Sequence, residues 1–301
     1  MIRQKETVSG GLLEIDFYPV NAAGSKLPKK EPQPKTKAEI EAQKKYEQKR
    51  AIKRVIRMIN ANFDKYDLML SPTYDPMYAP LDMKRAEKDI KNYFDRIKRL
   101  RKSELKKVER QLKEIPRENP FLVDIRNELL LKRRLLRRPF KYFYVIEQIV
   151  YQTGMFAGMP NYHFHVFMTG GLSTEQVEKK WHKGIEVNAT RYKPEMFGPE
   201  RAAKYIAKDP QGKRRFRHSK NCVKYTKEKI KDNVFKRKHL EKLCKERVDD
   251  KQYWERKYKG YQFLKSYPLY NPYNDQWYCS VIMYKADGTA PPWKIEDWAV
   301  A

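Results

Sequence analysis

Cysteine is scarce in this chain of 301 residues. The three cysteines, Cys222, Cys244 and Cys279, lie far apart, and no Cys-x-x-Cys pair occurs. This spacing argues against a zinc knuckle and against a disulfide framework. It is typical of a protein that stays in the reducing cytoplasm.

Long apolar runs are also missing. No stretch approaches the roughly 18 consecutive apolar residues that a bilayer-spanning helix needs, and the N-terminus lacks the apolar core of a signal peptide. We therefore expect a soluble protein without a membrane partner.

Acidic residues are too few to balance the basic ones. There are 38 Asp and Glu against 66 Lys and Arg, which gives a formal net charge of +28. The electrostatic field of such a positive charge attracts polyanions. Aromatic residues make up 13% of the chain, and many of the 21 tyrosines stand beside basic residues, as in 257–261. Rings that stack on bases beside cations that meet phosphates suit single-stranded nucleic acid. Most of these tyrosines also fit ordinary half-buried strand positions.

The pattern along the chain predicts one main domain with extensions. Residues 1–36 indicate a tail and linker, in which 11–18 alternates as an edge strand would. Residues 37–225 form the main domain, with a charged helical insertion at about 101–138, and residues 226–301 form a C-terminal extension of helix and strand. The order of elements predicts an α+β fold with a central antiparallel sheet and flanking basic helices.

Hydrophobic periodicity locates the elements of the main domain. Apolar residues recur at helical spacing from Ala51 to Ile59 and again from Ala86 to Ile97, the second helix opening at Asp82. Aromatic and β-branched runs predict strands, two of which are joined by a glycine-bearing loop as a hairpin. The expected strands span 68–74, 141–151 and 162–168, and later helices are expected at 173–181 and 199–208.

The second strand of this hairpin carries His163-Phe164-His165. Residues two apart in a strand point to the same face, so the two imidazoles would lie side by side. Spacing alone favours surface or packing histidines. Glu147 is the only acidic residue between positions 141 and 162, and pairing of the strands would bring it close to the histidines. Two imidazoles and a carboxylate suit Mg²⁺ or Mn²⁺ acting on a phosphate, whereas a solvent-facing edge Glu is the alternative.

A candidate nucleophile lies on the helix expected at 199–208. Tyr205 and Lys208 are three residues apart and share a face. A phenol, with a pKa of about 10, attacks poorly unless cations stabilise the phenolate, and Lys204, Lys208 and the metal are candidates for this. Taken alone, a tyrosine on a helix is usually a packing residue.

These pieces in combination resemble the HUH endonucleases, and most of all the rolling-circle replication initiators of small single-stranded DNA phages and plasmids. The likeness covers roughly residues 50–225 and extends to the segments 181–184 and 214–221. The matching pieces are, in order, Thr73-Tyr74, Glu147, His163-Phe164-His165 and Tyr205-Ile-Ala-Lys208.

The resemblance implies a five-stranded, RNA-recognition-like sheet and a role for each matching residue. His163, His165 and Glu147 would hold Mg²⁺ or Mn²⁺. Tyr205 would attack a phosphate of the origin DNA, keep the 5′ end as a phosphotyrosine and free a 3′-OH, with Lys208 placing metal and phosphate. The residues expected to contact DNA are Thr73, Tyr74, Lys204, Arg214, Arg215 and Arg217.

The same resemblance implies partners in the cytoplasm of a host bacterium. No G-x-x-x-x-G-K-[ST] motif occurs, so strand separation would fall to a host helicase, and a host DNA polymerase would extend the 3′-OH. Arg201 stands where two-tyrosine initiators carry a second nucleophile, which implies a single-tyrosine enzyme. Closing the circle would then need another protomer, water or another tyrosine such as Tyr192.

Two other functions fit the same residues. A transposase or relaxase of the same superfamily would cut and rejoin DNA with the same groups. A non-enzymatic, basic single-strand-binding protein would carry the histidine pair incidentally.

Overall fold

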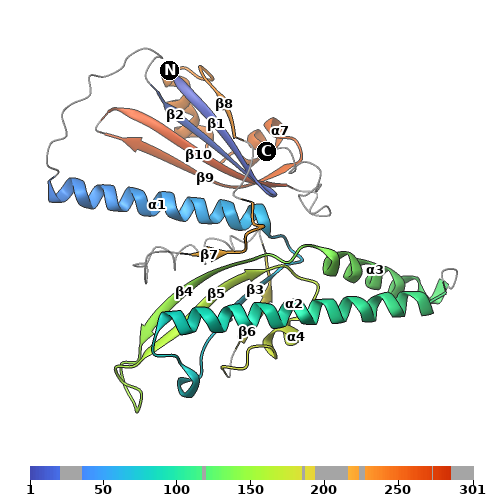
Figure 1. The fold of residues 1–301 in the computed structure, drawn as a ribbon. Coiled ribbons are helices and arrows are strands. Elements are labelled where there is room, and N and C mark those ends of the chain that lie inside the picture. Colours follow the sequence, from blue (N-terminus) through green and yellow to red (C-terminus); the bar gives the residue numbers. More distant parts are fainter. Residues whose placement is uncertain are drawn as a thin grey trace. The chain divides into compact units, whose positions relative to one another are not determined.

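A computed structural model describes the chain at residues 1–20, 36–116, 120–184, 187–193, 216–223, 228–272 and 274–285. The chain divides into two compact units, the first made of Met1–Ala61 and Val223–Ala301 and the second of Asn62–Cys222 (Figure 1). Each unit contains a five-stranded antiparallel sheet with helices, which confirms the predicted α+β class. The chain thus builds two sheets where one central sheet was predicted, and the second unit is inserted into the first.

The sheet of the second unit has the strand order β6-β3-β5-β4-β7, with β5 at its centre. The predicted hairpin is present, because β4 and β5 pair along their whole length. The strands span Leu68–Pro72 (β3), Tyr142–Val150 (β4), Pro160–Met168 (β5), Val187–Arg191 (β6) and Arg217–His218 (β7).

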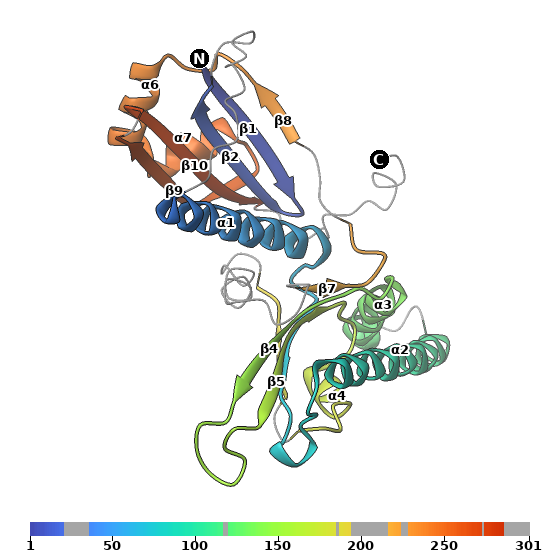
Figure 2. The same ribbon diagram turned by 60° about the vertical axis from the view of Figure 1, so that its left-hand side comes forward.

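One face of this sheet packs against helix α2 (Met83–Glu114), as Figure 2 shows. Alternate residues of β5, Phe164 and Val166 among them, are fully buried in this core together with the predicted inner positions of α2 from Ala86 to Ile97. Asp82 caps α2 as predicted, its side chain accepting a hydrogen bond from the backbone N–H of Arg85. The unit also contains η1 (Pro76–Tyr78), η2 (Pro120–Leu122), α3 (Val123–Arg137) and α4 (Thr174–Glu178).

Helix α2 is longer than the sequence analysis predicted. Its inner face continues through the buried residues Arg101, Glu104, Val108 and Leu112, so one helix covers both the predicted helix and the first part of the predicted insertion. Because Arg101 and Glu104 are charged, they interrupt the apolar periodicity of the sequence, and the continuation of the helix was not predicted. The helix ends at Glu114, shortly before Pro116.

The first unit is built around a second sheet, of order β8-β1-β2-β10-β9. Residues 1–20, predicted to be part of a tail, instead form a hairpin whose second strand lies at the centre of this sheet, with Leu13, Ile15 and Phe17 in its core. Gly10, with a φ of 59°, makes the turn between the two strands. The strands span Ile2–Ser9 (β1), Leu12–Pro19 (β2), Glu228–Lys231 (β8), Tyr261–Asn271 (β9) and Gln276–Lys285 (β10).

Helices lie on both faces of this second sheet (Figure 2). On one face, Trp254 of α7 packs with Leu240, Leu243 and the inner residues of β2 and β10. On the other face lies α1, from which Lys53 and Arg57 form ion pairs with acidic residues of β2. The helices are α1 (Lys37–Asn62), α6 (Arg237–Lys242), the π-helical turn η4 (Leu243–Arg247) and α7 (Lys251–Lys257).

Helices α1 and α2 are long enough to cross a bilayer, but both are rich in charged residues. In the described ranges of the chain, no helix has the apolar character that a membrane span requires.

Candidate functional site

The histidine pair lies on the central strand of the second unit, on the sheet face opposite α2. Tyr162, Phe164 and Val166 of β5 point into the α2 core. His163 and His165 therefore point to the other face, where both are half-buried. The predicted side-by-side placement of the two imidazoles is confirmed.

Glu147 lies beside this pair, as the hairpin geometry predicted. It is directly opposite His163 in the β4–β5 register, and its Oε2 atom lies 3.2 Å from Nε2 of His165. The side chains of Glu147 and His165 are each 15% exposed, so both keep a small solvent-accessible surface. The alternative of a Glu that faces only solvent does not describe this contact.

Thr73 is a further member of the cluster. The chain continues beyond β3 to form an isolated bridge between Thr73 and His163, and the Thr73 hydroxyl lies 3.1 Å from Nδ1 of the imidazole. A hydroxyl on Nδ1 orients the ring and directs Nε2 toward any ligand. Thr73 was predicted to contact DNA; the structure places it against the histidine.

The loop after α4 holds Thr73 in this position. The indole N–H of Trp181 donates a hydrogen bond of 2.9 Å to the Thr73 carbonyl. Gly184 approaches the same carbonyl so closely that a Cβ atom at position 184 would collide with it. The sequence resemblance included this segment without a role for it, and the structure supplies one.

The electrostatics of the cluster favour a neutral imidazole. Burial lowers the pKa of His163 below its usual value, although the carboxylate of Glu147 acts in the opposite direction. The neutral form is the one that binds metal ions.

The donor atoms of the cluster are of the types that bind Mg²⁺ or Mn²⁺. They are engaged with other partners, since His165 contacts Glu147 and His163 contacts Thr73. Over the described residues, no three His, Cys, Asp or Glu side chains are placed so that they could hold a metal ion together. The donor atoms are thus of the right chemical types for a divalent cation, but in this arrangement they do not point to one common position.

Two residues predicted to contact DNA lie elsewhere. Tyr74 is only 2% exposed, packs against Phe164 and Trp181, and donates a hydrogen bond to Asp89, so it belongs to the core. Arg217 is ion-paired with Glu87 of α2, on the sheet face opposite the histidines. Neither residue lies beside the histidines, because motif order does not reveal which face of the sheet a residue occupies.

The candidate nucleophile, Tyr205, lies outside the described residues, as do Lys204, Lys208, Arg214 and Arg215. Tyr192, considered as a second tyrosine, is 1% exposed, with its ring edge against Phe167 at a centroid distance of 5.4 Å. A phenol buried in this way is poorly placed to attack DNA.

The chain matches no protein-family model, no curated protein and no solved structure. The likeness to HUH endonucleases therefore depends on the sequence motifs alone.

Proposed function

We propose that the chain is a replication initiator that nicks single-stranded origin DNA through Tyr205 and so starts rolling-circle replication. The observation that best supports this is the contact between Glu147 and His165, with His163 beside them on the same face of the sheet. The side chains of Glu147 and His165 are partly exposed there, at 15% each, whereas Phe143 and Phe167 on the same face are fully buried. The net charge of +28 is consistent with a polyanionic substrate.

In this proposal His163, His165 and Glu147 would hold Mg²⁺ or Mn²⁺, which would polarise the scissile phosphate as a Lewis acid. Tyr205 loses its phenolic proton to solvent, and its oxygen forms a bond to phosphorus while the bond from phosphorus to O3′ breaks. The tyrosine keeps the 5′ phosphate, and the leaving oxygen takes up a proton to become the 3′-OH. Lys208 stabilises the charge on the phosphate, and a host helicase and polymerase continue replication.

A nicking assay tests this proposal. Full-length protein is incubated with labelled single-stranded DNA from its own replicon and Mn²⁺, and the products are separated on a denaturing gel. We expect a protein-linked fragment that disappears with EDTA and falls by at least about 100-fold in His163→Ala, His165→Ala and Tyr205→Phe. Tyr74→Phe, which removes only the phenolic oxygen of a core residue, is the matched control and should retain activity.

A second candidate is a basic single-strand-binding protein without catalysis. The observation in its favour is that the cluster's donors are bonded to one another and to Thr73 rather than converging on a metal position. This candidate function predicts that the protein binds DNA but neither cleaves it nor forms an adduct, whichever divalent cation is added. A transposase or relaxase would give the same adduct and differs only in the DNA ends that it joins.

A further inference from the structure

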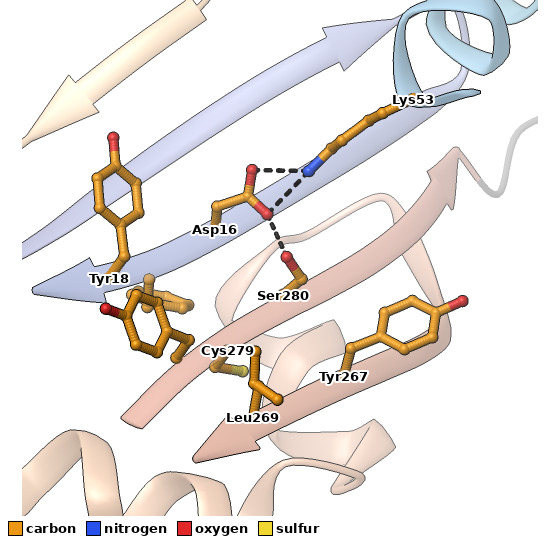
Figure 3. A pocket seen from close by; sticks show the side chains of 9 residues that line it. Asp16, Tyr18, Lys53, Tyr267, Leu269, Cys279 and Ser280 are labelled. Atoms are coloured by element: carbon orange, nitrogen blue, oxygen red, sulfur yellow. Dashed lines mark hydrogen bonds and ion pairs between the residues drawn. The ribbon is translucent and has the colours of Figure 1, made fainter. Parts of the chain in front are cut away.

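A pocket of about 400 Å³ opens on the sheet of the first unit, on the face that α1 covers in part. Figure 3 shows its lining, which comes from β2, β9, β10 and the lysine at position 53 of α1. This volume is at the lower end of the range for small-molecule sites and suits one ring system rather than a large ligand.

Polar groups form the floor of the pocket. Asp16 of β2 and Ser280 of β10 are cross-strand neighbours, and the serine hydroxyl donates to the carboxylate. Lys53 donates to both carboxylate oxygens, at 3.1 and 3.0 Å. Asp16 is 19% exposed and Lys53 is 39% exposed, so a ligand can reach both an acceptor and a donor that lie side by side.

Rings surround this floor. Figure 3 shows Asp16 and Ser280 between the rings of Tyr18 and Tyr267. Tyr267, the direct cross-strand partner of Ser280, is 48% exposed, and the ammonium group of Lys265 lies 5.0 Å from the centre of its ring. An exposed ring with a cation next to it offers a base a stacking surface and offers the adjoining phosphate a counter-charge.

We propose that this pocket binds one base of single-stranded DNA and that it prefers a base with an exocyclic amine to thymine. Cytosine, adenine and guanine each carry an amine near a ring acceptor, and these two groups match the acceptor of Asp16 and the donor of Lys53. Thymine lacks the amine. The inference rests on the proposed function for the nature of the ligand, and it adds a second binding surface, distant in sequence from the histidine cluster.

Binding of labelled oligo(dC) and oligo(dT) of equal length to the full-length protein, measured by fluorescence anisotropy in EDTA, tests the pocket without any cleavage. We expect oligo(dC) to bind more tightly. Tyr267→Ala should weaken its binding by roughly 5- to 150-fold, the contribution of one stacked base. Asp16→Asn should bring the affinities for the two oligonucleotides together.

Tyr270→Ala is the matched control. Tyr270 lies on the same strand and is 43% exposed, but it contacts Trp277 on the opposite face of the sheet and does not line the pocket. We expect its affinity to stay within about twofold of the unaltered protein. Equal losses in the two tyrosine variants, no loss in Tyr267→Ala, or no binding of either oligonucleotide would overturn the proposal.

The proposed base-binding pocket and the proposed nicking reaction can be refuted independently of each other. A metal-dependent adduct together with normal oligonucleotide binding by Tyr267→Ala would refute the pocket and leave the endonuclease standing. Base-selective binding that depends on Tyr267 and Asp16, without an adduct under any condition, would support the pocket and refute the endonuclease.

Discussion

Thr73 contacts His163 because the chain leaves β3 at Pro72 and makes one further bridge to β5. Its side chain is oriented by that bridge, and its carbonyl by the indole of Trp181. Nothing in the sequence pattern separates a threonine that binds DNA from one that orients a histidine. The distinction depends on which strands are neighbours, and it appears only in the fold.

Replacing Thr73 by valine keeps the shape of the side chain and removes the hydroxyl from Nδ1 of His163. We expect Thr73→Val to weaken Mn²⁺ binding by roughly 10- to 100-fold, the usual effect of removing a group that orients a metal-binding histidine. Titration calorimetry of the full-length protein with Mn²⁺ measures it. Thr73→Ser retains the hydroxyl and should bind as the unaltered protein does; equal affinities of the serine and valine variants would show that Thr73 does not position His163.

At the scale of elements, the β4–β5 hairpin could be predicted because its evidence is local. The two strands alternate in character and are joined by a glycine-bearing loop, so the sequence already indicated a position of Glu147 beside the histidines. The role of β2 was missed, because its neighbour β10 comes more than 250 residues later and no local pattern reveals that pairing.

Arg101 joins three elements of the second unit. Arg101 is 4% exposed, and its guanidinium donates to carbonyl oxygens at the end of α3, including Leu135 at 3.0 Å and Leu136 at 3.1 Å, and to Gly170 after β5. Burial lowers the pKa of Arg101 to about 10, so it stays charged at neutral pH. A buried cation with several carbonyl partners is costly to remove, because each partner loses its donor.

We expect Arg101→Met to lower the free energy of unfolding of the second unit by at least about 3 kcal/mol. Hydrogen exchange of the β5 amides, measured in the full-length protein, reports the stability of the second unit by itself. We expect these amides to exchange faster in Arg101→Met than in the unaltered protein. Lys102→Met, the neighbouring exposed position on α2, should change stability by less than about 0.5 kcal/mol. Protection of β5 that is the same in both variants would mean that the Arg101 contacts contribute little.

At the scale of the whole molecule, each unit has a hydrophobic core of its own among the described residues. Trp254 is fully buried in the first core, where its indole N–H donates to the Val248 carbonyl at 2.9 Å. We expect Trp254→Ala to destabilise the first unit by about 3–5 kcal/mol, so that amide exchange accelerates in β2 and β10. Exchange in β5 should stay unchanged. An equal acceleration in β5 would show that the two sheets unfold as one cooperative body.

The proposed function depends most on Tyr205, which is assigned as the nucleophile from the sequence alone. Mass spectrometry of the protease-digested protein–DNA adduct, formed with Mn²⁺ on origin DNA, locates the point of attachment. The proposal predicts a nucleotide linked through its 5′ phosphate to the peptide that contains Tyr205, and no adduct from Tyr205→Phe. An adduct on another residue, or an undiminished adduct in Tyr205→Phe, would contradict the assignment of the nucleophile.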